Sequence, residues 1–167
     1  MSVSILPADN YIVINKTIIT DEDNKILSML YLPIIGSLPI MLYNTLVNDL
    51  NKQTIISYEF EHAHLLSNLR ISCKELEQAR NKLEGIGLLK TYYKKDSVGK
   101  YIYELYSPVS AHEFFAHPIF NIVLYNNVGK KEYERLVDYF KLFKMNKEGY
   151  EEVTQWANQR HYDNERF

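Results

Sequence analysis

The sequence predicts a mainly α-helical domain with a small β-hairpin, an α+β winged helix, followed by a C-terminal helical extension used for oligomerisation. Three observations predict this class. Ser72 and Glu75 form a capping box, in which the two side chains satisfy free N–H groups at the start of a helix. The glycines within residues 85–87 end that helix, and residues 88–106 read as two strands around a polar bend. Helix, strand, loop and strand in this order are typical of a winged helix.

The predicted helix after Ser72 is amphipathic. Its apolar face consists of Leu76, Ala79, Leu83 and Ile86. Its charged residues are Lys74, Arg80 and Lys82 against Glu75, Glu77 and Glu84, so the charges sum to zero. Because carboxylates repel DNA phosphates, this helix is poorly suited to enter a major groove.

Upstream of this helix the pattern predicts one strand and three helices. Residues 11–14 are short and rich in β-branched side chains, which favours an edge strand or an extended arm packed on the domain. The helices are expected at residues 21–32, 37–52 and 59–68, with a short segment at 54–57 between the last two. The first helix begins with acidic residues, which the helix dipole favours at that end.

Residues 26–48 carry no charge and are long enough to cross a bilayer. Pro33, Gly36 and Pro39 interrupt the stretch, and a broken segment would expose unpaired backbone groups to lipid. We therefore expect two water-soluble helices joined at this interruption, with Ser37 as the N-cap of the second and Pro39 in its first turn.

Downstream of the hairpin the sequence predicts a helical extension. Ser110 and Glu113 form a second capping box, Pro118 restarts the helix, and residues 126–129 separate it from a further helix. The chain becomes polar from Asn146. We expect three parts: residues 1–107 form the winged-helix body with an N-terminal arm, residues 108–145 the oligomerisation extension, and residues 146–167 a polar linker or truncated tail.

The extension is more apolar than one short helix can hide, and it is too short to enclose a core of its own. A second copy of the chain would complete its burial, and symmetric pairing is the commonest way to do so. The alternative is that the extension folds back and these residues join the intramolecular core. The expected interface residues are Phe114, Phe115, Ile119, Phe120, Ile122, Val123, Tyr133, Val137 and Phe140.

Lysine and tyrosine gather on the hairpin. Such a surface can touch a phosphate backbone or stack on an unpaired base, or it is a solvated lysine edge that deters strand aggregation. The whole chain has 19 basic and 21 acidic residues, a net charge of −2, whereas DNA-binding domains usually carry a basic excess. We therefore expect DNA binding by this domain alone to be weak or absent. The candidate contacts are Lys90, Tyr92, Lys94, Lys95 and Lys100.

The sequence contains no pattern of an enzyme, and we expect no cofactor and no metal site. His62 and His64 lie two residues apart, on different sides of a helix, and we expect both to face solvent. The single Cys73 excludes an internal disulfide, and the N-terminus lacks the features of a signal peptide. These features predict a cytoplasmic, non-enzymatic protein.

Several short motifs occur together in one order. They are residues 31–36 (Tyr-Leu-Pro-Ile-Ile-Gly), 42–43, 82–90, 101–105, 113–115 and 124–129. From about Tyr11 to Phe140, the chain resembles the N-terminal domain of the DnaB/DnaD replication-initiation family of low-GC Gram-positive bacteria. These are helicase-loading and membrane-attachment proteins, not the replicative helicase that shares the name.

The resemblance implies a winged helix whose helical extension mediates association into dimers or tetramers. It implies a scaffold in primosome assembly that helps to load the replicative helicase when chromosomal replication begins. Other primosome proteins and the helicase would be contacted through regions outside this chain, which we expect to continue past Phe167. Nucleoid or membrane association would accompany a cytoplasmic location. The alternative function is a DNA-binding transcription regulator that contacts DNA through its lysine-rich wing.

Overall fold

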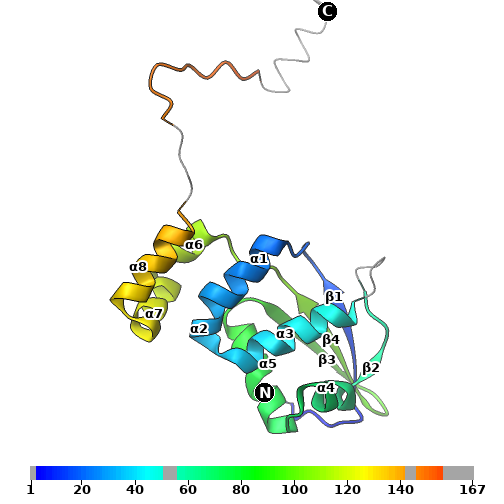
Figure 1. Ribbon diagram of the computed structural model, residues 1–167. Helices are drawn as coiled ribbons and strands as arrows, with labels where there is room; N and C mark the ends of the chain where they lie inside the picture. The colour runs from blue at the N-terminus through cyan, green and yellow to red at the C-terminus, as the bar shows by residue number, and fades with distance from the viewer. Residues whose placement is uncertain (1–2, 51–55, 142–145, 156–167) are drawn as a thin grey trace, which may run out of the picture.

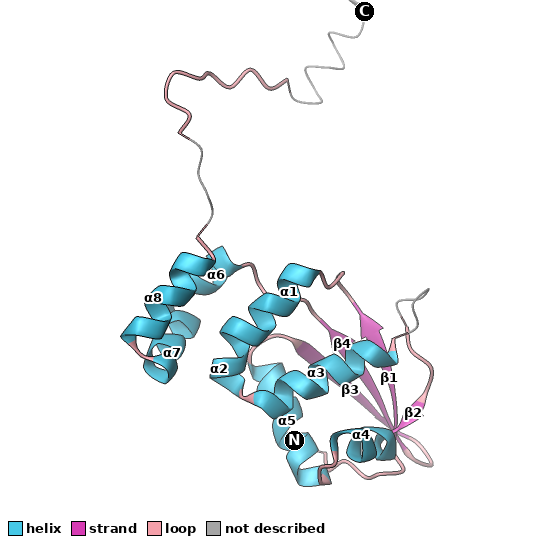
Figure 2. Cartoon of the chain, viewed as in Figure 1, coloured by secondary structure: helices cyan, strands magenta, loops and turns pink. Residues whose placement is uncertain are grey.

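The computed structural model describes residues 3–50, 56–141 and 146–155 of the chain (Figure 1). Within these residues a four-stranded sheet has the strand order β2-β1-β4-β3, and helices pack against it (Figure 2). The strands are β1 (Asn10–Asn15), β2 (Phe60–Glu61), β3 (Leu89–Lys95) and β4 (Gly99–Leu105). Helix α5 (Cys73–Gly85) leads directly into the β3–β4 hairpin, which confirms the predicted α+β winged helix.

Strand β1 lies inside the sheet. It runs parallel to β4 with Ile12 opposite Ile102, and its other side pairs with β2. The prediction that residues 11–14 form an edge strand or an extended arm is therefore wrong. Phe60 and Glu61, which we expected in a helix, extend instead and cover the outer side of β1.

Among the described residues, helices cover one face of the sheet and leave the other without a helix. Tyr11 and Tyr103 on the covered face are buried, whereas Ile12 and Ile102 on the other face are only partly buried. The covered face contributes aromatic side chains to the core, with the rings of Tyr11 and Tyr103 5.6 Å apart. We call the other side the open face.

The first predicted helix continues beyond Leu32. Helix α1 (Asp21–Ile26), a π-helical turn (Leu27–Tyr31) and α2 (Leu32–Ile35) follow one another without a break. Pro33 lacks an N–H and its ring would clash with a carbonyl four residues earlier in an α-helix. The wider π turn just before it, closed by Leu32 N–H donating to Leu27 O, fits the proline into a continuing helix.

Helix α3 (Ser37–Asp49) follows after Gly36, whose φ of +88° places it in the region that glycine adopts without strain. Gly36 is the N-cap, so Ser37 is the first helical residue and not the cap that we expected. The predicted end at Lys52, and residues 54 and 55 of the segment 54–57, lie outside the described residues. None of the helices described in the structure is long and apolar enough to cross a bilayer.

Helix α4 (His62–Leu69) begins later than predicted, because β2 takes its first residues. The start of α5 is confirmed in detail: Ser72 Oγ accepts from the Glu75 N–H, and the Glu75 carboxylate accepts from the Ser72 N–H, both at 3.2 Å. Gly87, at φ +82°, forms the predicted glycine stop.

The extension consists of α6 (Ala111–Ala116), α7 (Pro118–Val128) and α8 (Lys130–Tyr139). Ser110 Oγ caps α6 by accepting from the Glu113 N–H at 3.2 Å. His117 Nδ1 caps α7, since it accepts from two N–H groups of the first turn, and Pro118 occupies the first helical position as predicted. Residues 146–155 form no regular helix or strand, and Trp156 lies outside the described residues.

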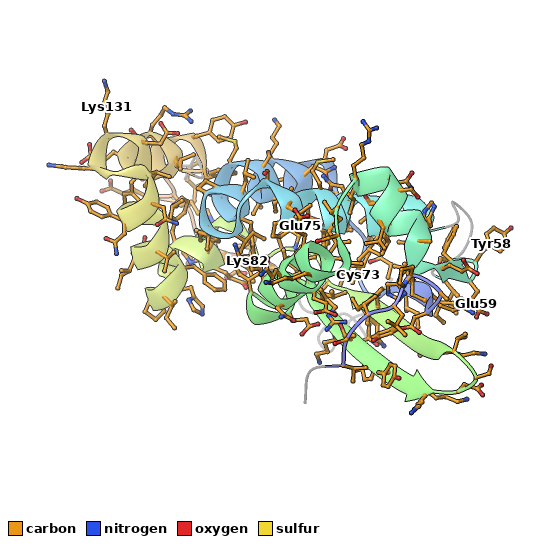
Figure 3. The ribbon with its side chains drawn as sticks, turned by 90° about the horizontal axis from the view of Figure 1, so that it is seen from below. Tyr58, Glu59, Cys73, Glu75, Lys82 and Lys131 are labelled. Carbon is orange, nitrogen blue, oxygen red and sulfur yellow. The ribbon has the colours of Figure 1, made fainter. Side chains whose placement is uncertain are left out.

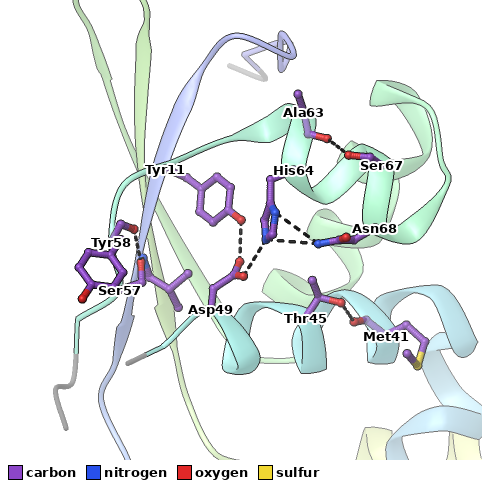
Figure 4. A network of polar contacts seen from close by, with 11 residues as sticks. Tyr11, Met41, Thr45, Asp49, Ser57, Tyr58, Ala63, His64, Ser67 and Asn68 are labelled. Atoms are coloured by element: carbon purple, nitrogen blue, oxygen red, sulfur yellow. Dashed lines mark hydrogen bonds and ion pairs between the residues drawn. The ribbon is translucent and has the colours of Figure 1, made fainter. Parts of the chain in front are cut away.

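Asp49 connects β1, α3 and α4 (Figure 4). The Tyr11 hydroxyl donates to Asp49 at 2.6 Å, and His64 Nε2 lies 2.8 Å from the other carboxylate oxygen. A carboxylate at a helix C-terminus is disfavoured by the helix dipole, and these two partners offset that cost. Burial raises the pKa of the Tyr11 hydroxyl, which therefore stays protonated and able to donate.

Candidate interaction surfaces

The extension folds back onto the first helices of the body. The Phe114 ring packs 5.4 Å from the Tyr31 ring, and the Phe120 ring lies 6.2 Å from it. The Tyr31 hydroxyl accepts from the Val109 N–H at 3.1 Å, and the Asn127 amide donates to the Pro33 carbonyl at 2.9 Å. Contacts at both ends of α7 therefore hold the extension against α2.

The predicted interface residues divide by exposure. Phe114 is completely buried within the chain, so the expectation that it meets a second copy is wrong: the Tyr31 ring already covers it. By contrast, Ile119 and Ile122 on α7 are 64% and 58% exposed. The remaining residues are partly buried, namely Phe115, Phe120, Val123, Tyr133, Val137 and Phe140.

Several of these partly buried residues form a second aromatic cluster between α6 and α8. The Phe115 ring lies 6.0 Å from Tyr133 and 6.4 Å from Phe140. The Tyr133 hydroxyl donates to the Asn121 side chain, which ties α8 to α7. This cluster holds the three helices of the extension together, and no described residue covers the side of α7 that carries Ile119 and Ile122.

An apolar groove of about 250 Å³ lies where α2, the end of α5 and the start of α7 meet. Its apolar lining comprises Ile34, Ile35, Ile86, Ile119, Phe120 and Val123, with Lys82 and Gly85 at α5. We call this groove, together with Ile122, the association surface. Sequence reasoning missed the contribution of Ile34 and Ile35, because that apolar pair was interpreted only as a joint between helices.

Helix α5 offers little to a DNA groove. Figure 3 looks onto this helix, with Cys73, Glu75 and Lys82 labelled along it. The N-terminal segment lies against it: Ile5 is buried, and its N–H donates to Glu77 Oε1 at 2.6 Å. A helix with balanced charge and a chain segment on its side is poorly placed to read bases.

The predicted wing residues point to both faces of the hairpin. Because side chains alternate along a strand, the open face of the sheet carries Lys90, Tyr92 and Lys94, whereas the side chain of Lys95 lies on the opposite face. Lys94 lies opposite Lys100 in the strand register, which brings two ammonium groups to one end of the open face. The candidate DNA contacts are therefore separated by the pleat, and Lys95 does not share a surface with the others.

Tyr106, directly after β4, contacts both Glu104 and Lys90 within the chain. The Tyr106 hydroxyl donates to the Glu104 carboxylate, and this bond is the main reason that the pKa of Tyr106 rises to about 12. The Lys90 ammonium lies 5.3 Å from the centre of the Tyr106 ring, a cation–π contact. Lys90 is thus already engaged within the chain.

His62 is buried, so the expectation that it faces solvent is wrong. Its Nδ1 lies 2.7 Å from the Asp9 carbonyl oxygen and must donate to it, so Nε2 accepts from the Tyr103 hydroxyl at 2.6 Å. Burial lowers the pKa of His62, which keeps the imidazole neutral. In the part of the chain that the structure describes, no three His, Cys, Asp or Glu residues lie close enough to hold a metal ion.

Comparisons with known proteins agree on one family. The chain is 30% identical, over 89% of its length, to the replicative helicase loading/DNA remodeling protein DnaB of Staphylococcus aureus, and it spans 32% of that relative. The fold resembles the crystal structure of primosome protein DnaB (residues 1–300) from Geobacillus stearothermophilus. The TM-score is 0.83 at 27% identity, and the match covers 92% of this chain and 59% of that one. Residues 5–163 match the model of the DnaB N-terminal winged helix domain, and the chain therefore belongs to this family.

Proposed function

We propose that this chain is a non-enzymatic oligomerisation domain of a helicase-loading protein that acts in the initiation of DNA replication. The replication role is supported by the relatives, which are named as a helicase loading protein and a primosome protein. Because the chain spans about a third of the curated relative, the activities of a whole loader belong to the proposal and not to the findings.

One observation carries the association proposal. Ile119 and Ile122 stand more than half exposed on α7, beside the groove between the extension and the body. Two neighbouring exposed isoleucines next to an apolar groove are typical of a surface that a partner covers. A second copy of the chain would bring the same surface, and a two-fold axis through α7 would bury both isoleucines of each copy.

We propose other primosome proteins and the replicative helicase as partners of a full-length loader that contains this domain. The alternative of a transcription regulator is supported by no comparable observation, since the charges of α5 cancel and the relatives act in replication.

Light scattering after size exclusion tests the proposal. The unmodified chain should have the mass of a dimer or tetramer at micromolar concentration. The double variant Ile119→Lys, Ile122→Lys should be a monomer, because pairing would then bury four ammonium groups in an apolar contact. Leu6→Lys is the matched control, since Leu6 is 60% exposed near α4, away from the extension. A monomeric unmodified chain, or a double variant with unchanged mass, would contradict the proposal.

A further inference from the structure

We propose that the open face of the sheet carries a binding groove for an unpaired nucleotide of a single nucleic-acid strand. The groove encloses about 290 Å³ and is formed by β1, β3 and β4 together with Glu59. Its open-face lining comprises Asn10, Ile12, Glu59, Tyr92, Lys94, Lys100 and Ile102. This site lies outside the association surface, and the proposal does not depend on self-association.

The dimensions of the groove favour a single ring system. Ligand pockets enclose roughly 300–1,000 Å³, so a groove of about 290 Å³ is just below the small end of that range. A helix of a partner protein, about 10 Å across, is too large to be enclosed by it. Ile12 and Ile102 are paired neighbours on adjacent strands and form an apolar floor on which a flat base can lie.

An aromatic wall stands beside this floor. Tyr92 is opposite Ile102 in the hairpin and is 48% exposed, so its ring is available to a ligand. Bases of an unpaired strand stack on such rings, whereas the bases of a duplex are already stacked on one another. The wall therefore favours a single strand over a double helix.

The two ends of the groove differ in charge. Lys94 and Lys100 form a cationic end that matches a phosphate, although Lys100 also lies 3.9 Å from Asp96. Across the sheet from Lys94, on the β2 side, Glu59 Oε1 accepts at 2.7 Å from the amide of Asn10, the register partner of Lys100; this bond holds the carboxylate in place and leaves its second oxygen as an acceptor. A carboxylate accepts readily from an exocyclic amine such as N4 of cytosine. A phosphate at Lys94 on β3, a flat ring on Ile102 and Ile12, and an amine at Glu59 on the β2 side describe a nucleotide whose base carries an amino group.

Fluorescence anisotropy with labelled oligo-dC and oligo-dT of equal length tests this groove. The unmodified chain should bind oligo-dC more tightly than oligo-dT, by about tenfold if Glu59 accepts from the cytosine amine. An oligo-rC probe beside them identifies which sugar the groove accepts, and preferred binding of either cytosine strand supports the proposal. No binding of any strand overturns it.

Single-residue variants distinguish binding in the groove from general electrostatic attraction to the strand. Tyr92→Leu should weaken oligo-dC binding by about tenfold, the effect of losing one stacking ring. Lys94→Gln should also weaken it, whereas Lys95→Gln, which removes the same charge on the other face, should not. Equal losses in the two lysine variants, or unchanged binding by Tyr92→Leu, would overturn the proposal.

Glu59→Gln gives the sharpest distinction. If Glu59 reads the base, the preference for oligo-dC should fall; if it only repels phosphate, both strands should bind more tightly and base reading is overturned. Light scattering of each variant keeps this result apart from the association proposal, because all of these residues lie outside the association surface.

Discussion

Replacing Phe114 with alanine tests whether the extension belongs to the fold of a single copy. The side chain is fully buried, and its ring lies 5.4, 5.8 and 5.5 Å from those of Tyr31, Phe115 and Phe120. Phe→Ala substitutions in cores cost about 3–5 kcal/mol, and each aromatic pair contributes about 0.5–1.5 kcal/mol beyond its buried area. With three ring partners lost, we expect the free energy of unfolding to fall by about 4 kcal/mol.

The assay is urea unfolding followed by circular dichroism, at a protein concentration where light scattering shows a monomer. Ile119→Ala is the control, because a residue 64% exposed should change stability by about 0.5 kcal/mol or less. A loss of less than about 1 kcal/mol for Phe114→Ala would refute the reasoning. If the slope of the unfolding curve also decreases, the extension detaches while the body stays folded, because less surface is then exposed on unfolding.

Two further predictions concern the body. Burial lowers the pKa of His62, so just below its ordinary value of about 6.5 only the unfolded chain takes up the proton, and the free energy of unfolding should fall as the pH drops through that window. His62→Gln should flatten this part of the pH profile measured by urea unfolding, and a profile of unchanged slope would contradict the assignment. Ser72→Ala should cost about 1 kcal/mol, because Ser72 caps α5 through its hydroxyl, and thermal unfolding against the exposed control Ser4→Ala would show it.

The winged helix could be predicted because its signals are local. The capping box at Ser72, the glycine stop at Gly87 and the hairpin each depend on residues within a few positions of one another. The same holds for the start of α7, where Pro118 stands at the first helical position. Such features follow from backbone chemistry and need no knowledge of distant partners.

The errors arose where a distant partner decides the outcome. Phe60 and Glu61 are compatible with a helix, but pairing with β1, far away in the sequence, draws them into a strand. His62 was expected in solvent, yet Asp9 and Tyr103 satisfy both ring nitrogens in the core. Contacts between residues tens of positions apart leave no periodic trace in the sequence, so periodicity could not reveal them.

The candidate surfaces could be predicted only in part for the same reason. Ile119 and Ile122 were expected at an interface, and both are exposed on α7. Phe114 differs because Tyr31, on another helix, covers it. In the wing, strand alternation separates Lys94 from Lys95 once the register is known, whereas the sequence alone grouped them as neighbours.

The two proposed surfaces occupy different ends of the molecule. Figure 3 shows Glu59 at the end that carries the hairpin and Lys131 in the extension at the other end. Pairing of two copies through α7 would therefore leave both open faces uncovered, and one assembly would present two nucleotide grooves. Once a strand occupies the first groove, binding to the second becomes intramolecular, which raises overall affinity without any new contact. A dimer of a chain with a net charge of −2 would then bind a single strand through two grooves at once. Binding through one basic surface would instead need an excess of positive charge.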